Sequence, residues 1–493
     1  MFRAYNQTQT FLLPPNLEEF IKPMHPGRLI NDLVEKLDLS ALMRRYGKMG
    51  QPAYAVKMMI KVILYGYTVG VFSSRKLTRA CQENLAFKYL AGMEEPTFKT
   101  FIEFRKRHKE DMKGVFIQTV KLAKELGLAL FREVALDGTK IEADTSKHKA
   151  MSYGRMQEEE KRLKEQIEGL LKQGQDEDAK DEEAYGAEHD GYSLPEDLSR
   201  AQDRLKKIEE AKAALEAREA KDHPGEKIDP KKQISFADKE ARCFAKPGQG
   251  ARYIYNSQAT VDMDTQIIVE NHIEDSVTDA GAVEPALEGM ANESGIVPEK
   301  MAIDGGYANQ ATLESCESRG VTPVCAASQE KTTPPPTEKK AGDPVRKPST
   351  PITAFSYDRK ANTMKCPHGV EFLFDHWNSN GTVATYRSSG PLTCACATRT
   401  LKDGQAVREV DKSHLARRRL KEILQIPENQ KLYGHRKTTV EPVFGQIKQG
   451  MGFRRYLYRG IDKVASEWDV VCAAFNLKKM TALLSATPGF LGA

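Results

Sequence analysis

Three acidic residues stand in surroundings where a carboxylate could act on a phosphodiester. Asp137 and Asp304 each follow a short apolar run and precede glycine, and Glu441 lies among basic and apolar residues near the end of the chain. Hard divalent cations such as Mg²⁺ prefer oxygen ligands, and phosphodiester chemistry often uses two such ions about 3.5 to 4 Å apart. The three acids therefore predict a catalytic site that holds two Mg²⁺ or Mn²⁺ ions.

Two strands and one helix would have to position these acids. Acids just past the ends of neighbouring strands can converge, because the crevice at the strand ends is open. An Asp-Gly pair is also an ordinary turn signal, so each junction alone is weak evidence. Four apolar residues near Glu441 recur at helical spacing: Val440, Val443, Phe444 and Ile447. Because proline is tolerated in the first turn of a helix, Glu441 is predicted to begin a helix just before Pro442.

These segments resemble those of the DDE transposases of bacterial insertion sequences, whose RNase H-like domain carries Asp, Asp and Glu in this order. The last segment is similar to the Tyr-x2-Arg-x3-Glu-x6-Lys signature of one branch of that family. Its counterparts here are Tyr433, Arg436, Glu441 and Lys448. Four residues rather than three separate Arg436 from Glu441, so Lys437 is an alternative for the basic position.

The resemblance also implies a fold. Asp304-Gly305-Gly306-Tyr307 is similar to an element that follows the fourth strand of such domains, and residues 253–262 look like the second strand. Residues 265–270 are β-branched and read as the third strand, and residues 320–325 as the fifth. The expected fold class is α/β, with an RNase H-like mixed sheet flanked by helices in residues 130–493.

The function implied by the resemblance is transposition. Such an enzyme binds the terminal inverted repeats of its element on double-stranded DNA, cleaves with two divalent metals, and joins the 3′-OH ends to target DNA as a homo-oligomer. Asp137, Asp304 and Glu441 would hold the metals, and the basic residues around Glu441 would contact phosphates. Two alternatives stay open: a DNA-binding repressor or inactive element-derived copy, and a two-metal structure-specific nuclease.

Positive charge gathers around the third acid. The chain as a whole carries +5, but residues 412–463 hold thirteen Lys and Arg against four Asp and Glu, a net charge of +9. This window includes Arg454 and Arg455 in the run Phe453-Arg454-Arg455-Tyr456-Leu457-Tyr458-Arg459. Basic residues interleaved with aromatic ones favour phosphate pairing and stacking on unpaired bases. An ordinary solvated basic face is the competing interpretation.

Residues 1–129 are predicted to form an all-helical N-terminal domain. Apolar residues recur at helical spacing from Leu29 to Leu37, and a second apolar segment spans residues 55–67. Ser73 and Thr97 are predicted N-caps of two basic helices. This segment resembles the family's DNA-recognition domain, although helical domains with scattered Lys and Arg are also common in proteins that never touch DNA.

Two insertions are expected to interrupt the catalytic domain. The first, residues 150–250, is rich in charged residues and is predicted to contain an antiparallel helical hairpin with narrow apolar stripes. Its role is either a solvated spacer or a contact to a second copy or to DNA.

The second insertion, residues 327–425, begins as a Pro/Lys/Thr-rich linker and contains Cys366, His368, Cys394 and Cys396. Clustered cysteines in a reducing compartment are more often metal ligands than disulfides, so these four residues are candidate ligands of Zn²⁺. The Cys-x-His and Cys-x-Cys spacings are tighter than the usual gaps, which leaves ordinary reduced cysteines as the alternative.

Length and hydropathy complete these expectations. The chain has 493 residues, of which 40% are hydrophobic, enough for more than one domain with sizeable cores. No stretch approaches ~20 uninterrupted apolar residues, and the N-terminus lacks an apolar signal core. A cytoplasmic, nucleoid-associated protein with no membrane partner is expected.

Overall fold

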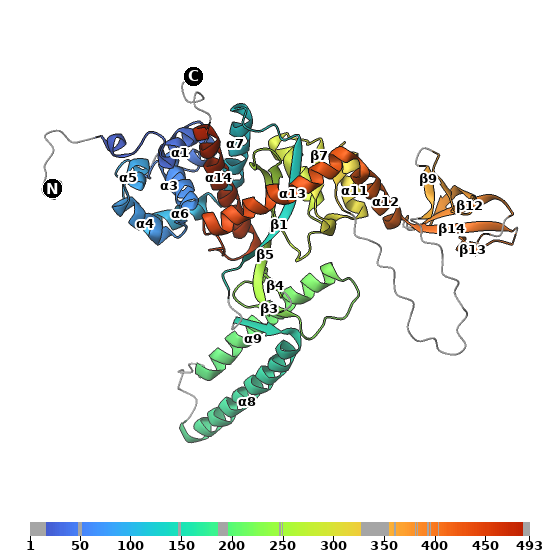
Figure 1. The fold of residues 1–493 in the computed structure, drawn as a ribbon. Helices are drawn as coiled ribbons and strands as arrows, with labels where there is room; N and C mark the ends of the chain where they lie inside the picture. The colour runs from blue at the N-terminus through green and yellow to red at the C-terminus, as the bar shows by residue number, and fades with distance from the viewer. Residues whose placement is uncertain are drawn as a thin grey trace.

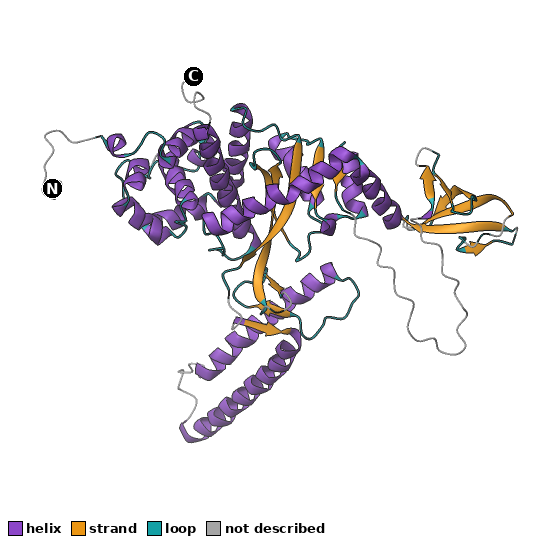
Figure 2. Cartoon of the chain, viewed as in Figure 1, coloured by secondary structure: helices purple, strands orange, loops and turns teal. Residues whose placement is uncertain are grey.

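A computed structural model gives the fold of the chain (Figures 1 and 2). It describes residues 16–47, 52–145, 149–185, 196–245, 248, 250–326, 354–358, 361–379, 381, 383–391, 394, 396–402 and 404–486, with only the backbone for 173–185, 196–197 and 399. The Pro/Lys/Thr-rich linker and the turn of the predicted helical hairpin lie outside these residues. None of the described helices combines the length and hydropathy needed to cross a bilayer.

The centre of the molecule is a mixed sheet in the order β4-β5-β1-β7-β8, with β6 also pairing β5. Strand β1 runs antiparallel to β5 and parallel to β7, and β7 runs parallel to β8. The strands are β1 (Glu133–Glu142), β4 (Arg242–Phe244), β5 (Arg252–Asp262), β6 (Ile268–Glu274), β7 (Lys300–Ile303) and β8 (Thr322–Val324). The α/β class and the second and fifth strands are confirmed, whereas the third strand, expected at residues 265–270, begins three residues later, at Ile268.

Helices between these strands lie against the sheet. They are α10 (Val283–Gly289) with its π-helical extension η4 (Met290–Ser294), the short η5 (Gly305–Tyr307), and α11 (Gln310–Ser318). Helix α10 contacts β6, and α11 contacts β8.

Strand β1 differs from the expectation that Asp137 ends a strand. It continues five residues further, to Glu142, because β5 pairs with it over its whole length. What ends beside Asp137 is the parallel ladder with β7, whose last rung joins Leu136 to Ile303. Asp137 therefore lies within a strand, and Asp304 lies just past the end of the neighbouring one.

The first described part of the chain is helical. Its elements are η1 (Leu17–Phe20), α1 (Pro26–Glu35), α2 (Ser40–Met43), α3 (Val56–Thr68), α4 (Ser74–Glu83), α5 (Leu85–Ala91), α6 (Phe98–Arg107), η2 (Lys109–Asp111) and α7 (Met112–Glu125). Ser73 caps α4 by accepting from the Lys76 N–H, and Thr97 caps α6 by accepting from the Thr100 N–H, as their positions predict.

These helices share one core with the sheet. The C-terminal helix α14 (Ile461–Ala486) packs against α1, α3 and α7 and against β6 (Figure 1). Asn476 of α14 accepts from the Ile268 N–H and donates to the Ile268 carbonyl, both at 2.8 Å, and also donates to the Thr119 hydroxyl on α7. One buried side chain thus satisfies the backbone of edge strand β6 and joins it to helices from both ends of the chain.

Two further helices approach the site, α12 (Lys412–Gln425) and α13 (Pro427–Gly445), the second followed by the π-helical segment η7 (Gln446–Gly450). The prediction that Glu441 begins a helix is wrong. Helix α13 begins at Pro427, and Pro442 lies inside it. The carbonyl of Thr438, four residues earlier, has no proline N–H to accept from, and the Gln266 side chain donates to it instead at 3.4 Å.

The first insertion contains the predicted helical hairpin, α8 (Tyr153–Tyr185) against α9 (Glu196–Asp222), extending away from the sheet (Figure 1). Its small core includes Leu163, Ile208 and Leu215. Leu171 is exposed, because it follows Leu170 directly and two adjacent residues of a helix cannot both face the same partner helix. Sequence reasoning missed the short pair β2 (Ala150–Ser152) and β3 (Gln233–Ser235) at its base.

The second insertion contains a six-stranded antiparallel sheet that the sequence did not reveal. Its order is β13-β14-β12-β11-β10-β9. The strands are β9 (Ser356–Asp358), β10 (Thr363–Lys365), β11 (Glu371–Trp377), β12 (Val383–Pro391), β13 (Arg399–Thr400) and β14 (Gln405–Asp411). Strand β14 runs directly into α12, which contacts β8 and α11 of the main body.

Glu467 of α14 is a buried acid between the helices and the chain after η7. It accepts from the Tyr67 hydroxyl at 3.0 Å and from the Leu457 N–H at 2.9 Å. Burial raises the pKa of Glu467 to about 7, although the Leu457 N–H and Arg105 act to lower it. The folded state therefore binds a proton here more readily than the unfolded chain does.

We predict that Glu467→Gln removes a pH-dependent part of the stability. A raised folded-state pKa stabilises the fold below the unfolded value of about 4.5, and this contribution is lost as pH rises through about 7. The free energy of unfolding of the variant, relative to the wild type, should therefore rise by about 2 to 3 kcal/mol between about pH 5 and pH 8. Thermal melts over this range measure the difference, with exposed Glu94→Gln as the control. A difference that stays flat with pH would contradict the assignment.

Candidate active site

Asp137 and Asp304 face each other across the end of the parallel ladder between β1 and β7. They follow Leu136 and Ile303, the residues of its last rung. Asp137 accepts from the Gly138 N–H at 2.9 Å, and Asp304 accepts from the Gly305 N–H at 2.8 Å as the N-cap of η5. These short-range bonds set the orientation of both carboxylates.

Arg436 of α13 joins the two acids. Its Nη1 lies 3.3 Å from Asp137 Oδ2, and its Nη2 lies 3.4 Å from Asp304 Oδ1. The Arg436 side chain is only 4% exposed, and its guanidinium carbon lies 5.9 Å from the centre of the Tyr433 ring, one helical turn earlier. Its Nε is buried and makes no hydrogen bond among the described residues. One buried cation thus pairs with two carboxylates, one within β1 and one just past the end of β7.

The charges at this point are not fully balanced. Burial raises the pKa of Asp137, the Gly138 N–H and Arg436 lower it, and the charge of Asp304 raises it again. Asp304 remains open to solvent, with 56% of its side chain exposed. The Asp137 and Asp304 carboxylates together carry more negative charge than Arg436 neutralises, and Asp304 is open to solvent. Carboxylate oxygens of this kind are the ligands that hard divalent cations prefer, so the pair fits Mg²⁺ or Mn²⁺.

The structure separates the two candidates for the basic position. Arg436 points at the acids, whereas the next residue, Lys437, is exposed. Glu441 is also exposed, and five helical residues place it about 140° around α13 from Arg436. Contacts bring together Asp137, Asp304, Arg436 and Tyr433. Among the described ion pairs, none joins Glu441 to this group.

Lys448 and the two arginines lie along the far half of β1. Lys448 Nζ donates to the Lys140 carbonyl at 3.0 Å. Arg454 and Arg455 are exposed, and the backbone around them pairs with Glu142, whose N–H donates to the Arg454 carbonyl and whose carbonyl accepts from the Tyr456 N–H. Arg455 also binds the Glu142 carboxylate at 2.9 Å. Lys448, Arg454 and Arg455 therefore place positive charge beside the part of β1 that follows Asp137.

The proposed stacking role of Phe453 and Tyr456 is wrong. Both rings are fully buried, and they meet edge to face at 5.3 Å. The Tyr456 hydroxyl is bonded to Ser257 at 2.6 Å, inside the core. These aromatic residues fix the segment against the sheet, which leaves its arginines outside.

Sequence reasoning missed a polar network on the face of β1 opposite to the Asp137 side chain. Asp279 accepts from Lys140 Nζ at 2.9 Å and from the amides of Asn256 and Gln258 at 2.8 Å each. Gln258 in turn accepts from the Tyr307 hydroxyl at 2.7 Å. Asn256 and Gln258 are two positions apart in a predicted strand and therefore face the same side, so the sequence could have identified these two as a pair. Nothing in the sequence around Asp279 distinguished it.

Gly138 is required by this network rather than by a turn. A Cβ at this position would lie 2.3 Å from Gln258 Nε2 and 2.7 Å from Asp279 Oδ1. Both atoms are held by the hydrogen bonds described above, so neither can move freely. The Asp-Gly pair of β1 therefore reflects close packing beside an acid, not a reversal of the chain.

Two segments of the chain match known families. Residues 15–107 match a transposase domain (DUF772), and residues 366–481 match a transposase DDE domain. The second match includes α13 with Arg436 and Glu441, whereas Asp137 and Asp304 lie outside both matches. No curated protein matches the chain in sequence. The DDE domain implies dependence on a divalent metal.

Gly138→Ala is predicted to destabilise the fold by about 1 to 3 kcal/mol, because the added methyl overpacks the Gln258–Asp279 contact. The matched control is Gly434→Ala on α13, where a Cβ would meet nothing within 4 Å and alanine favours the helix. Denaturant unfolding should show a loss for the first variant and none for the second. Equal stability of the two variants would contradict the packing role of Gly138.

Proposed function

We propose that this chain is an insertion-sequence DDE transposase, as its matches to two transposase domain models support, and that it cuts and joins DNA at the ends of its element. It would bind the terminal inverted repeats, cleave at the element ends, and join the freed 3′-OH to target DNA. The observation that carries the proposal is the convergence of Asp137 and Asp304 on Arg436 at the end of a parallel ladder. The mixed sheet around it supports an RNase H-like catalytic domain.

The proposed metal ligands are Asp137, Asp304 and Glu441. Bound divalent ions would activate the attacking oxygen and stabilise the leaving oxygen. Asp137 and Asp304 would supply ligands from the sheet. Glu441 would supply the third from α13, where no ion pair among the described residues holds it.

Arg436 would act on the phosphate. A guanidinium fixed between the acids would offer N–H donors to a phosphate oxygen that gains charge in the transition state. Tyr433 supports the guanidinium from the previous turn of α13. Lys448, Arg454 and Arg455 would hold the phosphate backbone along β1, and exposed Lys437 would add a weaker contact.

Recognition of the element ends is assigned to the helices before β1. Exposed basic residues project from α4 and α6, among them Arg75, Arg79 and Arg107. The transposase-domain match covers α1 to α6. A split between end recognition in residues 1–129 and catalysis in residues 130–493 follows from this assignment.

The decisive experiment measures cleavage and strand joining, in Mg²⁺ or Mn²⁺, on labelled DNA carrying the native element end. We expect Asp304→Asn and Asp137→Asn to lower the rate on the order of 1,000-fold, since several kcal/mol of transition-state stabilisation depend on the metal ligands. End binding should persist. The matched control is Asp144→Asn, because Asp144 pairs with Arg459 at the surface, 2.8 Å away.

Other outcomes point to other functions. Binding of the ends with no cutting by the wild type would indicate a repressor or an inactive copy. Cutting that needs no inverted repeat and never joins strands would indicate a structure-specific nuclease.

Arg436→Ala and Lys437→Ala should separate the two basic candidates. Loss of the buried guanidinium is expected to slow joining about 100-fold or more, as for removal of a preorganised oxyanion donor. Loss of Lys437 should leave the rate near that of the wild type. It should reduce the slope of log K for DNA binding against log salt concentration by about 1, as expected for the loss of one phosphate contact. Single-turnover rates and binding at several salt concentrations measure the two effects. A larger rate loss in Lys437→Ala would reverse the assignment.

A further inference from the structure

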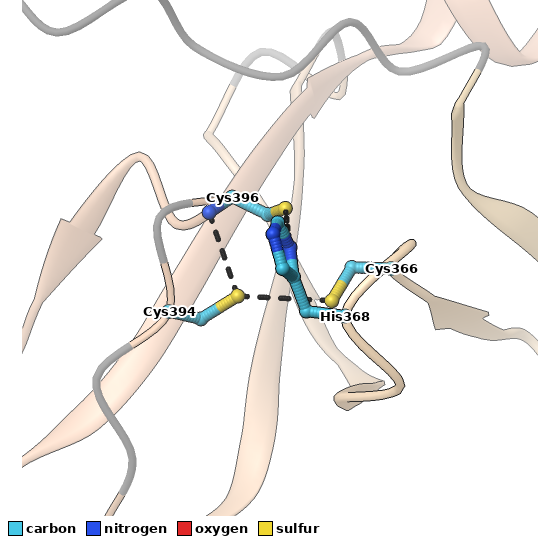
Figure 3. A group of neighbouring side chains, drawn as sticks. All are labelled: Cys366, His368, Cys394 and Cys396. Carbon is cyan, nitrogen blue, oxygen red and sulfur yellow. Dashed lines mark hydrogen bonds between the residues drawn. The ribbon is translucent and has the colours of Figure 1, made fainter.

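Four soft or borderline metal ligands meet in the second insertion, far along the chain from Asp137. The sulfurs of Cys366, Cys394 and Cys396 and a ring nitrogen of His368 all lie within 4.8 Å of one another (Figure 3). Cys366 Sγ and Cys394 Sγ are 3.7 Å apart, and His368 Nδ1 and Cys396 Sγ are 3.1 Å apart. A disulfide needs a sulfur separation of about 2.05 Å, so Cys366 and Cys394 are not bonded to each other.

The distances fit a tetrahedral thiolate site. With metal–sulfur bonds of about 2.3 Å, two sulfurs on a tetrahedral centre stand about 3.8 Å apart. The separation between Cys366 and Cys394 is already close to that edge. The set offers three thiols, one imidazole and no carboxylate, a composition that selects Zn²⁺ over Mg²⁺ or Mn²⁺.

Two tight turns explain how pairs of ligands separated by only one residue, Cys366 with His368 and Cys394 with Cys396, can face the same point. After β10, the Cys366 N–H donates to the Val370 carbonyl and the Gly369 N–H donates to the Cys366 carbonyl, each at 2.9 Å, with Gly369 at φ +83°. Between β12 and β13, the Ala397 N–H donates to the Cys394 carbonyl at 3.0 Å, and the Cys396 N–H donates to the Cys394 sulfur at 3.4 Å. Each turn presents two ligands toward the other turn, so one residue between them is enough.

The surrounding sheet is small enough to need a cross-link. Among the described residues, the apolar cluster at the core of β9–β14 has nine buried members, and two of them are Cys366 and Cys396 themselves. A segment of this size rarely buries enough apolar surface to be stable, and small folds commonly add a metal or disulfides. The cluster joins the β10–β11 turn to the β12–β13 connection, next to the register shift between Arg387 and Pro391.

We propose that Cys366, His368, Cys394 and Cys396 bind one Zn²⁺ in a closed structural site that holds the β9–β14 sheet together. All four positions are filled by protein ligands, which leaves no place for a reacting water. This site is chemically and spatially separate from the carboxylates that would hold the catalytic ions. It does not depend on the proposed transposase reaction.

The first test measures the metal content of the full-length protein, purified without a histidine tag and dialysed against a mild chelator. We expect about one Zn²⁺ per chain for the wild type and loss of that zinc in Cys366→Ser and Cys396→Ser. The matched control is Cys325→Ser, because Cys325 is buried in the main core outside the cluster. Protein without zinc, or full zinc in the two cluster variants, would overturn the proposal.

A second measurement remains informative if the variants do not fold. Wild-type protein stripped of metal and reloaded with Co²⁺ should show the visible absorption of tetrahedral cobalt with a strong thiolate charge-transfer band. Absence of that band would also overturn the proposal. Asp304→Asn should keep its full zinc content whatever happens to DNA cleavage, so failure of the zinc site and failure of the proposed function are distinguishable.

Discussion

Two carboxylates at the end of one parallel ladder create a charge problem that the surrounding structure is arranged to meet. Asp137 and Asp304 follow the same rung, so their charges repel, and burial of Asp137 adds to the penalty. Arg436 supplies the compensating charge from outside the sheet. A buried arginine side chain can reach both acids only if α13 lies across the end of the parallel ladder between β1 and β7, and α13 contacts both strands.

The course of α13 follows from this requirement. Its apolar side chains Val440 and Val443 are fully buried and hold the helix to the core. Pro442 leaves the Thr438 carbonyl without its helical donor, and Gln266 from the β5–β6 turn replaces that bond. At the other end, buried Asn429 donates to the Ile423 carbonyl at 2.9 Å and joins the start of α13 to the end of α12. Both ends of the helix that carries Arg436 are therefore tied to the sheet or to its neighbour.

Local patterns in the sequence identified those parts of the fold that local physics decides. The caps at Ser73 and Thr97, the strand at residues 253–262 and the helical hairpin depend on short-range hydrogen bonds or on periodic burial. The start of α13 was misjudged because Pro442 ordinarily ends or begins a helix, and a side chain far away in sequence compensates for it here. The sheet β9–β14 was missed because its burial is partly supplied by cysteines and three of its strands have only two or three residues.

The candidate site shows the same division. Asp137 and Asp304 could be selected from sequence because each follows a short apolar run. The choice between Arg436 and Lys437 could not be made, since adjacent helical residues differ only in the direction they face and the packing of α13 sets that direction. The role of Asp279 could not be predicted either. The three side chains that donate hydrogen bonds to it come from β1 and β5 and meet only in the folded sheet.

The second insertion is joined to the active-site helix without a flexible break. Strand β14 ends at Asp411, and the Asp411 carboxylate accepts from the Ser413 N–H as the N-cap of α12. Arg418 of α12 donates back to the Phe355 carbonyl at the start of the small sheet, and its guanidinium stands over the Tyr357 ring at 6.0 Å. The small sheet therefore packs on the helix that it leads into, and that helix is hydrogen-bonded to α13. A soft-metal cross-link within the small sheet would stiffen the far end of this path. The carboxylates proposed to hold Mg²⁺ or Mn²⁺ lie at its near end, so the two ligand sets would not compete for one ion.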